Sequence, residues 1–342
     1  MVTQQFIAPP SRAALFLVLT VNQGSDEVVR DVFADLSSIT RSVSFRTPAS
    51  GLNVVLGIGA HLWDRMFDLP RPKGLHPFVP LEGARHTAPS TPGDLLLHVR
   101  AAHMDACFEL SRLVMNRLRG HVEIVDETHG FKYYDERDLL GFVDGTENPE
   151  GEAAPTAVLI ADEDPKYTGG SYVIVQKYTH DLAGWDALPV EEQERAFGRS
   201  KLEDIEMPDT VKPINSHVAL NTIVEANGVQ RQIMRDNMPF GEFGTDEFGT
   251  YFIGYAADPG VIEQMLRNMF LGSPPGNTDR ILDFSTARTG TLFFTPTVDF
   301  LDNVPSASDR VDSAVAEIDP GSQAISAGLG IGGLRDAPDQ QN

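Results

Sequence analysis

Short apolar runs alternate along the first part of the chain with longer segments whose apolar residues recur at helical spacing. Residues 26–39 place Val28, Val29, Val32, Phe33 and Leu36 on one face, and residues 101–119 form a second amphipathic helix. The apolar or β-branched blocks typical of strands are residues 14–21, 52–58, 95–99 and 122–126. The resulting order β-α-β-β-α-β predicts a ferredoxin-like unit.

The same order of elements recurs in the second part, although no residue-level repeat is visible. The predicted helices are residues 190–197 and 260–270, and the predicted strands are residues 172–178, 218–224, 251–256 and 291–295. We therefore predict an α+β fold with two ferredoxin-like domains, residues 1–140 and 141–301, each with an antiparallel sheet. Residues 302–342 have no aromatic residue and predict a flexible tail.

Composition narrows the class of protein. A 41% apolar and 22% charged chain is typical of a soluble globular protein, and the net charge of -22 without a Lys or Arg cluster argues against nucleic-acid or anionic-membrane partners. A single cysteine, Cys107, cannot form an intrachain disulfide and favours a reducing compartment. The apolar run at residues 13–19 is too short to span a membrane and lacks export-signal features, so a cytoplasmic protein is expected.

The stretch Gly-Phe-Val-Asp-Gly-Thr-Glu-Asn-Pro at residues 141–149 lies between the two predicted domains. It sets the Asp144 carboxylate among small residues, where glycine permits positive φ and close approach of another group. An ordinary turn at Asp144-Gly145, followed by a loop at Asn148-Pro149, is the alternative interpretation.

Together with four further motifs, this stretch resembles the signature of the dye-decolourising peroxidases. The other motifs are Ser-Thr-Pro-Gly-Asp-Leu-Leu at 90–96, Gly-Gly-Ser-Tyr at 169–172, Asn-Ser-His at 215–217 and Arg-Asp-Asn-Met at 235–238. The resemblance extends from residue 10 to residue 297. It implies haem b as cofactor, bound mainly by the second domain, and hydrogen peroxide as oxidant. It also implies dyes, phenolics or other one-electron donors as reductants, and a homo-oligomer.

The resemblance singles out His217, among nine histidines, as the ligand of the haem iron. A ligating histidine needs an acceptor on its other ring nitrogen. Family comparison offers Asp279 for this role, while a surface-loop aspartate or a helix cap is the alternative interpretation of that residue. Asp283 is the second candidate acceptor. Cys107 is a rival ligand through its thiolate, but its place in an amphipathic helix favours a small buried core residue.

Splitting peroxide requires a group that moves a proton between the two oxygens and a cation that stabilises the departing one. Asp144 is the candidate for the first task and Arg235 for the second, with Asn237 as a hydrogen-bonding support. A carboxylate base favours activity at acid pH. Arg199, and less directly Lys201, are candidate partners for the haem propionates, with a solvated helix end as the alternative.

The tail contains Gly-Leu-Gly-Ile-Gly-Gly at residues 328–333, which matches G-x-G-x-x-G. A dinucleotide site is rejected, because no strand precedes the glycines and no helix follows. The segment resembles encapsulin cargo-loading peptides instead, with Leu329, Ile331 and Leu334 as the anchors. The expected location is therefore an encapsulin compartment in the cytoplasm, while a disordered end with chance hydrophobic residues is the alternative.

Two other functions stay open at this stage. One is a porphyrinogen oxidase or haem-processing enzyme, and the other is a haem store or shell-associated protein with incidental peroxidase activity. For donors too large for the pocket, the surface aromatic residues Trp185, Tyr133 and Tyr134 are candidate electron relays, with a packed or partly exposed aromatic residue as the alternative for each.

Overall fold

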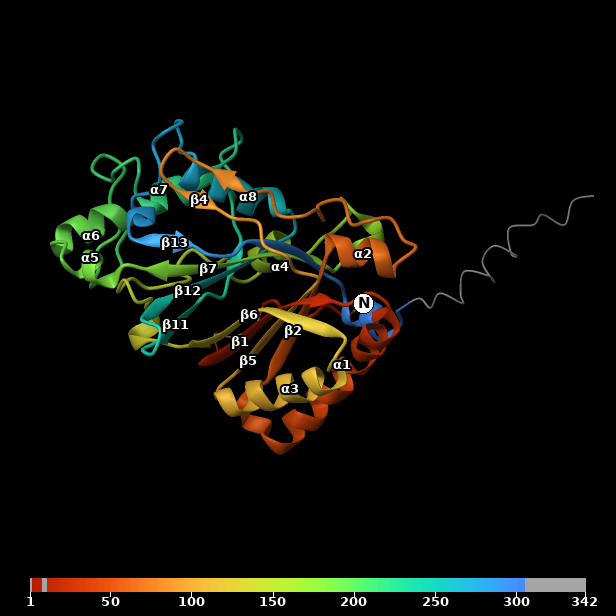
Figure 1. The fold of residues 1–342 in the computed structure, drawn as a ribbon. Helices are drawn as coiled ribbons and strands as arrows, with labels where there is room; N and C mark the ends of the chain where they lie inside the picture. Colours follow the sequence, from red (N-terminus) through yellow and green to blue (C-terminus); the bar gives the residue numbers. More distant parts are fainter. Residues whose placement is uncertain (1, 8–10, 305–342) are drawn as a thin grey trace, which may run out of the picture. The chain divides into compact units, whose positions relative to one another are not determined.

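One ten-stranded antiparallel sheet runs through both halves of the chain in the computed structural model, which describes residues 2–7 and 11–304 (Figure 1). The predicted anchors Leu329, Ile331 and Leu334 lie outside the described residues, with the rest of the tail from residue 305. Among the described residues, no helix is long and apolar enough to cross a bilayer.

The first half contains both predicted helices and all four predicted strands. Its elements are β1 (Ala13–Val21), α1 (Asp26–Arg46), β2 (Asn53–Gly59), α2 (Ala60–Met66), β3 (Leu81–Glu82), β4 (Thr87–Ala88), β5 (Leu95–Ala101), α3 (Met104–Arg117) and β6 (Val122–Phe131). The strand order β6-β1-β5-β2 is that of a ferredoxin-like sheet, as the sequence predicts.

The second half follows the same plan with longer insertions. Its elements are α4 (Ala153–Val158), β7 (Ser171–His180), α5 (Leu182–Asp186), α6 (Val190–Phe197), α7 (His217–Asn221), β8 (Ile223–Val224), β9 (Gln230–Arg231), β10 (Met234–Arg235), β11 (Met238–Glu242), β12 (Glu247–Ala256), α8 (Pro259–Phe270), β13 (Ser285–Ala287), β14 (Thr291–Thr295) and α9 (Val298–Asp302). Short 3-10 helices lie at Pro48–Ser50, Tyr134–Glu136, Pro165–Tyr167 and Arg280–Asp283.

The strand predicted at residues 218–224 is wrong. Residues 217–221 form helix α7 because the Ser216 side chain caps it by accepting from Ala219 N and the Asn221 amide donates to the His217 carbonyl. Only the short strand β8 remains of the prediction. The missing strand position in the sheet is taken by β10 and β11, both paired with β12.

The two halves share one sheet and one buried layer. Strand β14 pairs with both β7 and β2, which joins the half-sheets, while the domain boundary at residue 140 stays a prediction. Alternate residues of β1 face opposite ways: Leu15 and Leu17 belong to a core with α1 and α3, whereas Phe16 stacks on Tyr251 with ring centroids 4.1 Å apart. We call the buried side chains between the half-sheets the inter-sheet layer.

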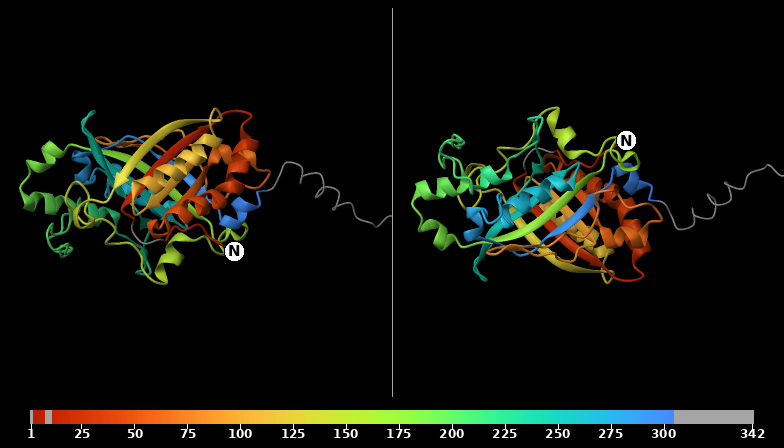
Figure 2. Two further views of the ribbon diagram at one scale, coloured as in Figure 1. Left: turned by 90° about the horizontal axis from the view of Figure 1, so that it is seen from below. Right: turned by 90° about the horizontal axis from the view of Figure 1, so that it is seen from above.

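Helices cover the outer faces of this arrangement. Helices α1 and α3 lie on the outer face of the first half-sheet, and α8 covers the second (Figures 1 and 2). β1 and β5 are buried on both faces, so both are largely apolar instead of alternating, and β5 also buries two polar residues, His98 and Arg100. The insertions between β7 and β12 form the side of the molecule that carries α5, α6 and α7 (Figure 1).

Candidate active site

A cavity of about 1320 Å³, counted with its open mouth, lies within the second half of the fold. Residues that line it all come from position 138 onward, and they include His217, Asp144, Arg235, Asn237 and Arg199. Apolar side chains from α8, among them Ile262, Met265, Leu266 and Met269, form much of its wall. The structure therefore brings together five of the residues singled out from the sequence.

His217 is fixed by a buried carboxylate from a distant part of the chain. Its Nδ1 lies 2.7 Å from Oδ2 of Asp279, which is fully buried, and Asp279 Oδ1 accepts from the backbone N–H of Ile281 at 3.0 Å. The other candidate acceptor, Asp283, pairs instead with Arg85 and Arg280. Asp279 is thus the carboxylate that contacts His217.

The hydrogen bonds around His217 define its tautomer. A carboxylate can only accept, so Nδ1 carries the proton that it donates to Asp279. The amide nitrogen of Asn221 lies 3.2 Å from the same Nδ1, but a protonated Nδ1 cannot accept a hydrogen bond, and Asn221 donates to the His217 carbonyl at 2.8 Å. Within the described part of the chain, Nε2 makes no hydrogen bond, which leaves its lone pair available.

The loop that carries Asp144 is held by a backbone hydrogen bond and by the packing of Phe142. The Asp144 N–H donates to the Glu136 carbonyl at 3.0 Å, and Gly145 after it adopts φ of +84°, a conformation suited to glycine. Phe142 is buried and stacks on Phe197 at 4.2 Å. The hydrogen-bonded turn spans Gly145–Asn148, with the Asn148 N–H donating to the Gly145 carbonyl at 3.0 Å, and Asp144 lies in the bend before it.

Asn148, which the sequence analysis left as a loop residue, clamps the strand that carries Arg235. Its side-chain Oδ1 accepts from the Arg235 N–H at 2.9 Å, and its Nδ2 donates to the Arg235 carbonyl at 2.7 Å. The amide thus replaces a strand partner at β10. Arg235 lies outside the strands predicted from the sequence, but it belongs to β10 and pairs with Gly254.

The guanidinium of Arg235 keeps an unused donor. Its Nε is buried, yet it has no hydrogen-bond partner among the described residues. A buried donor without an acceptor is costly, so it indicates a site at which a ligand supplies the acceptor. Asn237 donates from Nδ2 to Asp144 Oδ1 at 3.2 Å, which links the two predicted polar groups of the cavity.

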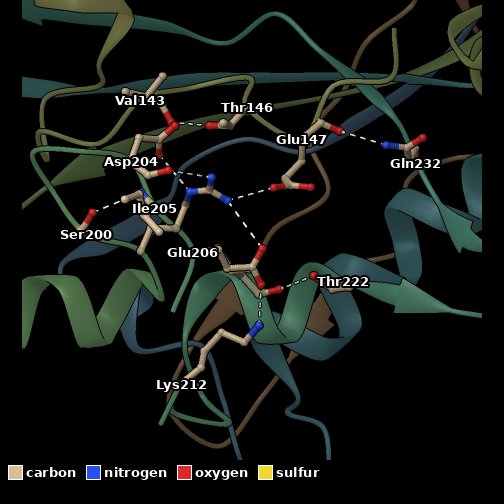
Figure 3. Close-up of polar contacts among 12 residues, drawn as sticks. Val143, Thr146, Glu147, Ser200, Asp204, Ile205, Glu206, Lys212, Thr222 and Gln232 are labelled. Carbon is tan, nitrogen blue, oxygen red and sulfur yellow. Dashed lines mark hydrogen bonds and ion pairs between the residues drawn. The ribbon is translucent and has the colours of Figure 1, made fainter. Parts of the chain in front are cut away.

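Arg199 lines the cavity, but carboxylates already surround it. Its Nε donates to Asp204 and its Nη1 to Glu147, both at 2.9 Å, and Glu206 lies 3.7 Å from Nη1 (Figure 3). Lys212 contacts Glu206 from the other side. Any further anion at Arg199 would have to compete with Glu147.

Two titratable residues of the cavity were missed by the sequence analysis. Burial lowers the pKa of His180 to about 4, and its ring nitrogens bond Ser285 Oγ at 2.8 Å and Thr250 Oγ1 at 2.9 Å. Neither nitrogen is free to bind a metal. Desolvation, with a smaller contribution from nearby Asp144, raises the pKa of Asp138 to about 7.

Asp138→Asn should change how stability depends on pH. The native carboxyl keeps its proton up to pH about 7, whereas the unfolded one loses it near 3.8, so wild type loses unfolding free energy as pH rises between these values. The variant lacks this loss and can still accept the Phe142 N–H. Urea unfolding should show the variant gaining about 2–3 kcal/mol on wild type between pH 5 and 7. A difference that stays constant with pH would contradict this.

Two other candidates from the sequence have structural positions. Cys107, on α3, is fully buried in the core and away from the cavity lining, and burial raises its pKa to about 12, so it is no thiolate ligand. Trp185 is fully buried and donates to the Leu140 carbonyl, so its prediction as a surface residue is wrong. Tyr134 is exposed, and Tyr133 is partly exposed.

Comparisons with known proteins agree with this geometry. Two family models match the chain: Dyp-type peroxidase, N-terminal, over residues 4–132, and Dyp-type peroxidase, C-terminal, over residues 135–300. A dye-decolorizing peroxidase of Rhodococcus erythropolis is 57% identical over 99% of this chain and 98% of its own length.

Two solved structures are also similar. The encapsulated DyP-type peroxidase of Mycobacterium smegmatis has a TM-score of 0.88 and 58% identity, over 89% of this chain and 99% of that one. A DypB variant of Rhodococcus jostii RHA1 in complex with heme has a TM-score of 0.86 and 56% identity, over 87% and 97%. With both halves matched and relatives this similar along almost the whole length, the chain belongs to the Dyp-type peroxidase family and is an enzyme.

Proposed function

We propose that this chain binds haem b and reduces hydrogen peroxide with electrons from dyes, phenolics or other one-electron donors. The observation that carries the proposal is the meeting of three groups in one cavity: His217 backed by Asp279, the Asp144 carboxylate, and Arg235 with its unused Nε–H. The haem-bound relative from Rhodococcus jostii supports the choice of cofactor.

The residues present fit a haem group. A flat apolar macrocycle suits the wall formed by α8, and the Nε2 lone pair of His217 suits a metal ion. The Asp279 carboxylate would hold the imidazole in orientation and raise its basicity. When bound, haem supplies an iron that takes two oxidising equivalents from peroxide and passes them to donors one electron at a time.

Asp144 and Arg235 would divide the handling of peroxide. The Asp144 carboxylate accepts a proton from one peroxide oxygen and returns it to the other, which leaves as water. The Arg235 guanidinium donates hydrogen bonds to the departing oxygen, where negative charge develops. Asn237 holds Asp144 in orientation through the 3.2 Å hydrogen bond. We assign a haem propionate to Arg199, in competition with Glu147 for Nη1.

Turnover with donors of different size tests this function. The haem-loaded protein should oxidise a bulky dye and a small phenol with peroxide, at rates above those of free haem. For the bulky dye we propose Tyr134 and Tyr133 as relays, because Tyr134 is exposed and their rings lie 4.5 Å apart. Conversion of a porphyrinogen with negligible donor oxidation would favour the haem-processing alternative.

We further propose that the protein is cytoplasmic cargo of an encapsulin shell, loaded through Leu329, Ile331 and Leu334, and that it is a homo-oligomer. Support comes from the apolar-glycine pattern of residues 326–335 and from the encapsulated relative of Mycobacterium smegmatis. Alternating apolar anchors at the end of a polar tether suit pockets on a partner surface.

Replacing Leu329, Ile331 and Leu334 with serine should abolish co-purification with a co-expressed encapsulin shell, because the apolar anchors are lost while length and charge are kept. Haem content and turnover in free solution should stay at the wild-type level, since the residues lie outside the matched family region. The measurement is the ratio of enzyme to shell after size-exclusion chromatography.

Serine replacements at Ala324, Ala327 and Ala337 provide a matched control, because they alter the same tail without removing a large apolar side chain. This control should load normally. A triple-anchor variant that fills shells at the wild-type ratio would rule out this mode of packaging.

A further inference from the structure

A buried ion pair connects the first half of the chain to the segment between Arg235 and Asn237. Arg100 lies on β5, is 1% exposed, and donates from Nη1 to Oδ2 of Asp236. Its Nη2 donates to the backbone carbonyl of Gln5. Asp236 is thus held from the inter-sheet layer, while its two neighbours line the cavity.

The strand is interrupted at this point without a change of register. Arg235 pairs with Gly254 and Met238 with Tyr251, which is the same register on both sides of the interruption. The Asp236 N–H still donates to the Ile253 carbonyl at 3.2 Å. The second hydrogen bond of this residue pair differs from that of a regular ladder, because the Ile253 N–H donates to the Asn237 side-chain Oδ1 at 3.0 Å.

Two acceptors therefore compete for one donor. In a regular antiparallel ladder the Ile253 N–H would donate to the Asp236 carbonyl. The Asn237 side-chain Oδ1 would then lose the hydrogen bond that orients its amide. In the observed arrangement Oδ1 of Asn237 is fixed by Ile253, which leaves Nδ2 directed at Asp144. Whatever holds Asp236 in place therefore influences which arrangement is adopted.

The basic side chains of His98 and Arg100 lie near Asp236, and Arg100 is the one that carries the positive charge. His98, fully buried on the same face of β5, bonds Tyr255 through Nδ1 at 2.8 Å, and its Nε2 lies 3.9 Å from Asp236 Oδ2. Burial, together with the charge of Arg100, holds the pKa of His98 well below its ordinary value, so the ring is neutral. The charge of Asp236 is then balanced by the guanidinium of Arg100.

We propose that Arg100 and Asp236 are positioning residues for the peroxide site, holding the interrupted strand so that Arg235 and Asn237 face the cavity. The inference rests on the proposed roles of Arg235 and Asn237. It gives the first half of the chain, which contributes no lining residue before position 138 in the described structure, a part in the chemistry. Buried ion pairs often add little stability compared with apolar pairs, so positioning accounts for the charges better than stability does.

Fluoride binding to the haem-loaded protein tests the proposal without relying on turnover. Fluoride is a small anion that binds haem iron and accepts hydrogen bonds from donors nearby. In the double variant Arg100→Met with Asp236→Asn, which leaves no unpaired buried charge, fluoride affinity should fall at least tenfold while haem content stays unchanged. The matched control is Asp126→Asn with Lys177→Met, an inter-sheet pair 3.9 Å apart and outside the cavity lining. It should change fluoride affinity less than twofold.

An Arg235→Leu variant measured in parallel separates two kinds of failure. If that variant binds fluoride normally, the proposed role of Arg235 is wrong. If it binds fluoride weakly while the Arg100 and Asp236 variant behaves like the control, the positioning inference is overturned. Should the double variant lose its haem, Asp236→Glu keeps both charges but lengthens one side chain. An unchanged fluoride affinity in Asp236→Glu would then overturn the inference, and at least threefold weaker binding would support it.

Discussion

Arg235→Leu should slow the reaction of the haem-loaded protein with peroxide by about 10²–10³-fold, which is the typical cost of losing one donor to a developing anion. Nε of Arg235 is buried without a partner in the described structure, so its donor capacity is reserved for a ligand. Haem content should be unaffected, because His217 lies on a separate helix. The measurement is the rate constant of the peroxide-dependent change in the Soret band after rapid mixing.

Arg231→Leu is the matched control for this variant. Arg231 lines the same cavity, but it pairs with Glu225 at 2.7 Å and is partly exposed. Its loss should change the peroxide rate only slightly. Equal rates for Arg235→Leu and wild type would show that the charge on the departing oxygen is stabilised elsewhere.

His217→Ala should produce a folded protein that holds haem weakly or not at all. His217 offers Nε2 as a ligand only because Asp279 occupies Nδ1 at 2.7 Å, and alanine removes both the ligand and the hydrogen bond. Helix α7 should persist, since Ser216 still caps it and the Asn221 amide still donates to the backbone carbonyl of residue 217. Haem content per chain, measured by the pyridine haemochrome assay after reconstitution, should fall to near background.

His180→Gln provides the comparison, since it alters another histidine of the same cavity. Both ring nitrogens of His180 are bonded to hydroxyl groups, so it has no lone pair to offer to iron. Its haem content should match that of wild type. Wild-type haem content in His217→Ala would disprove the assignment of His217 as the iron ligand. Loss of haem in His180→Gln alone would assign the ligand to His180 instead.

Hydrophobic periodicity predicts most of the fold, because apolar residues recur at one spacing along the buried face of a helix and at another along that of a strand. Helix α6 and strand β14 have the predicted bounds, α8 begins one residue earlier than predicted, and α1 continues to Arg46, beyond its predicted end at residue 39. The failure at residues 218–224 has a local cause. Five residues are too few to show a helical period, and the capping bonds of Ser216 and Asn221 are invisible to an apolar pattern.

The same limit explains the missed strands β10 and β11. At the junction of β10 and β11, Arg235 and Asn237 line the cavity and Asp236 contacts Arg100, so three consecutive polar residues break the expected alternation. Contacts between polar residues that lie far apart in the sequence cannot be predicted from an apolar pattern either. Neither the clamp of Asn148 on Arg235 nor the raised pKa of Asp138 follows from spacing, because both depend on segments brought together by folding.

Strands β10 and β11 keep one register against β12, so the number of residues in the exposed turn after Glu242 determines which residues of these strands face the cavity. Glu242 faces Glu247, and the residues between them set how far β11 is offset along its partner. One residue added or removed there would exchange the faces of the strand, sending Arg235 towards the inter-sheet layer and Asp236 into the cavity. Phe243 can vary in identity at little cost, since it is 92% exposed, but the number of residues in this turn affects the active site.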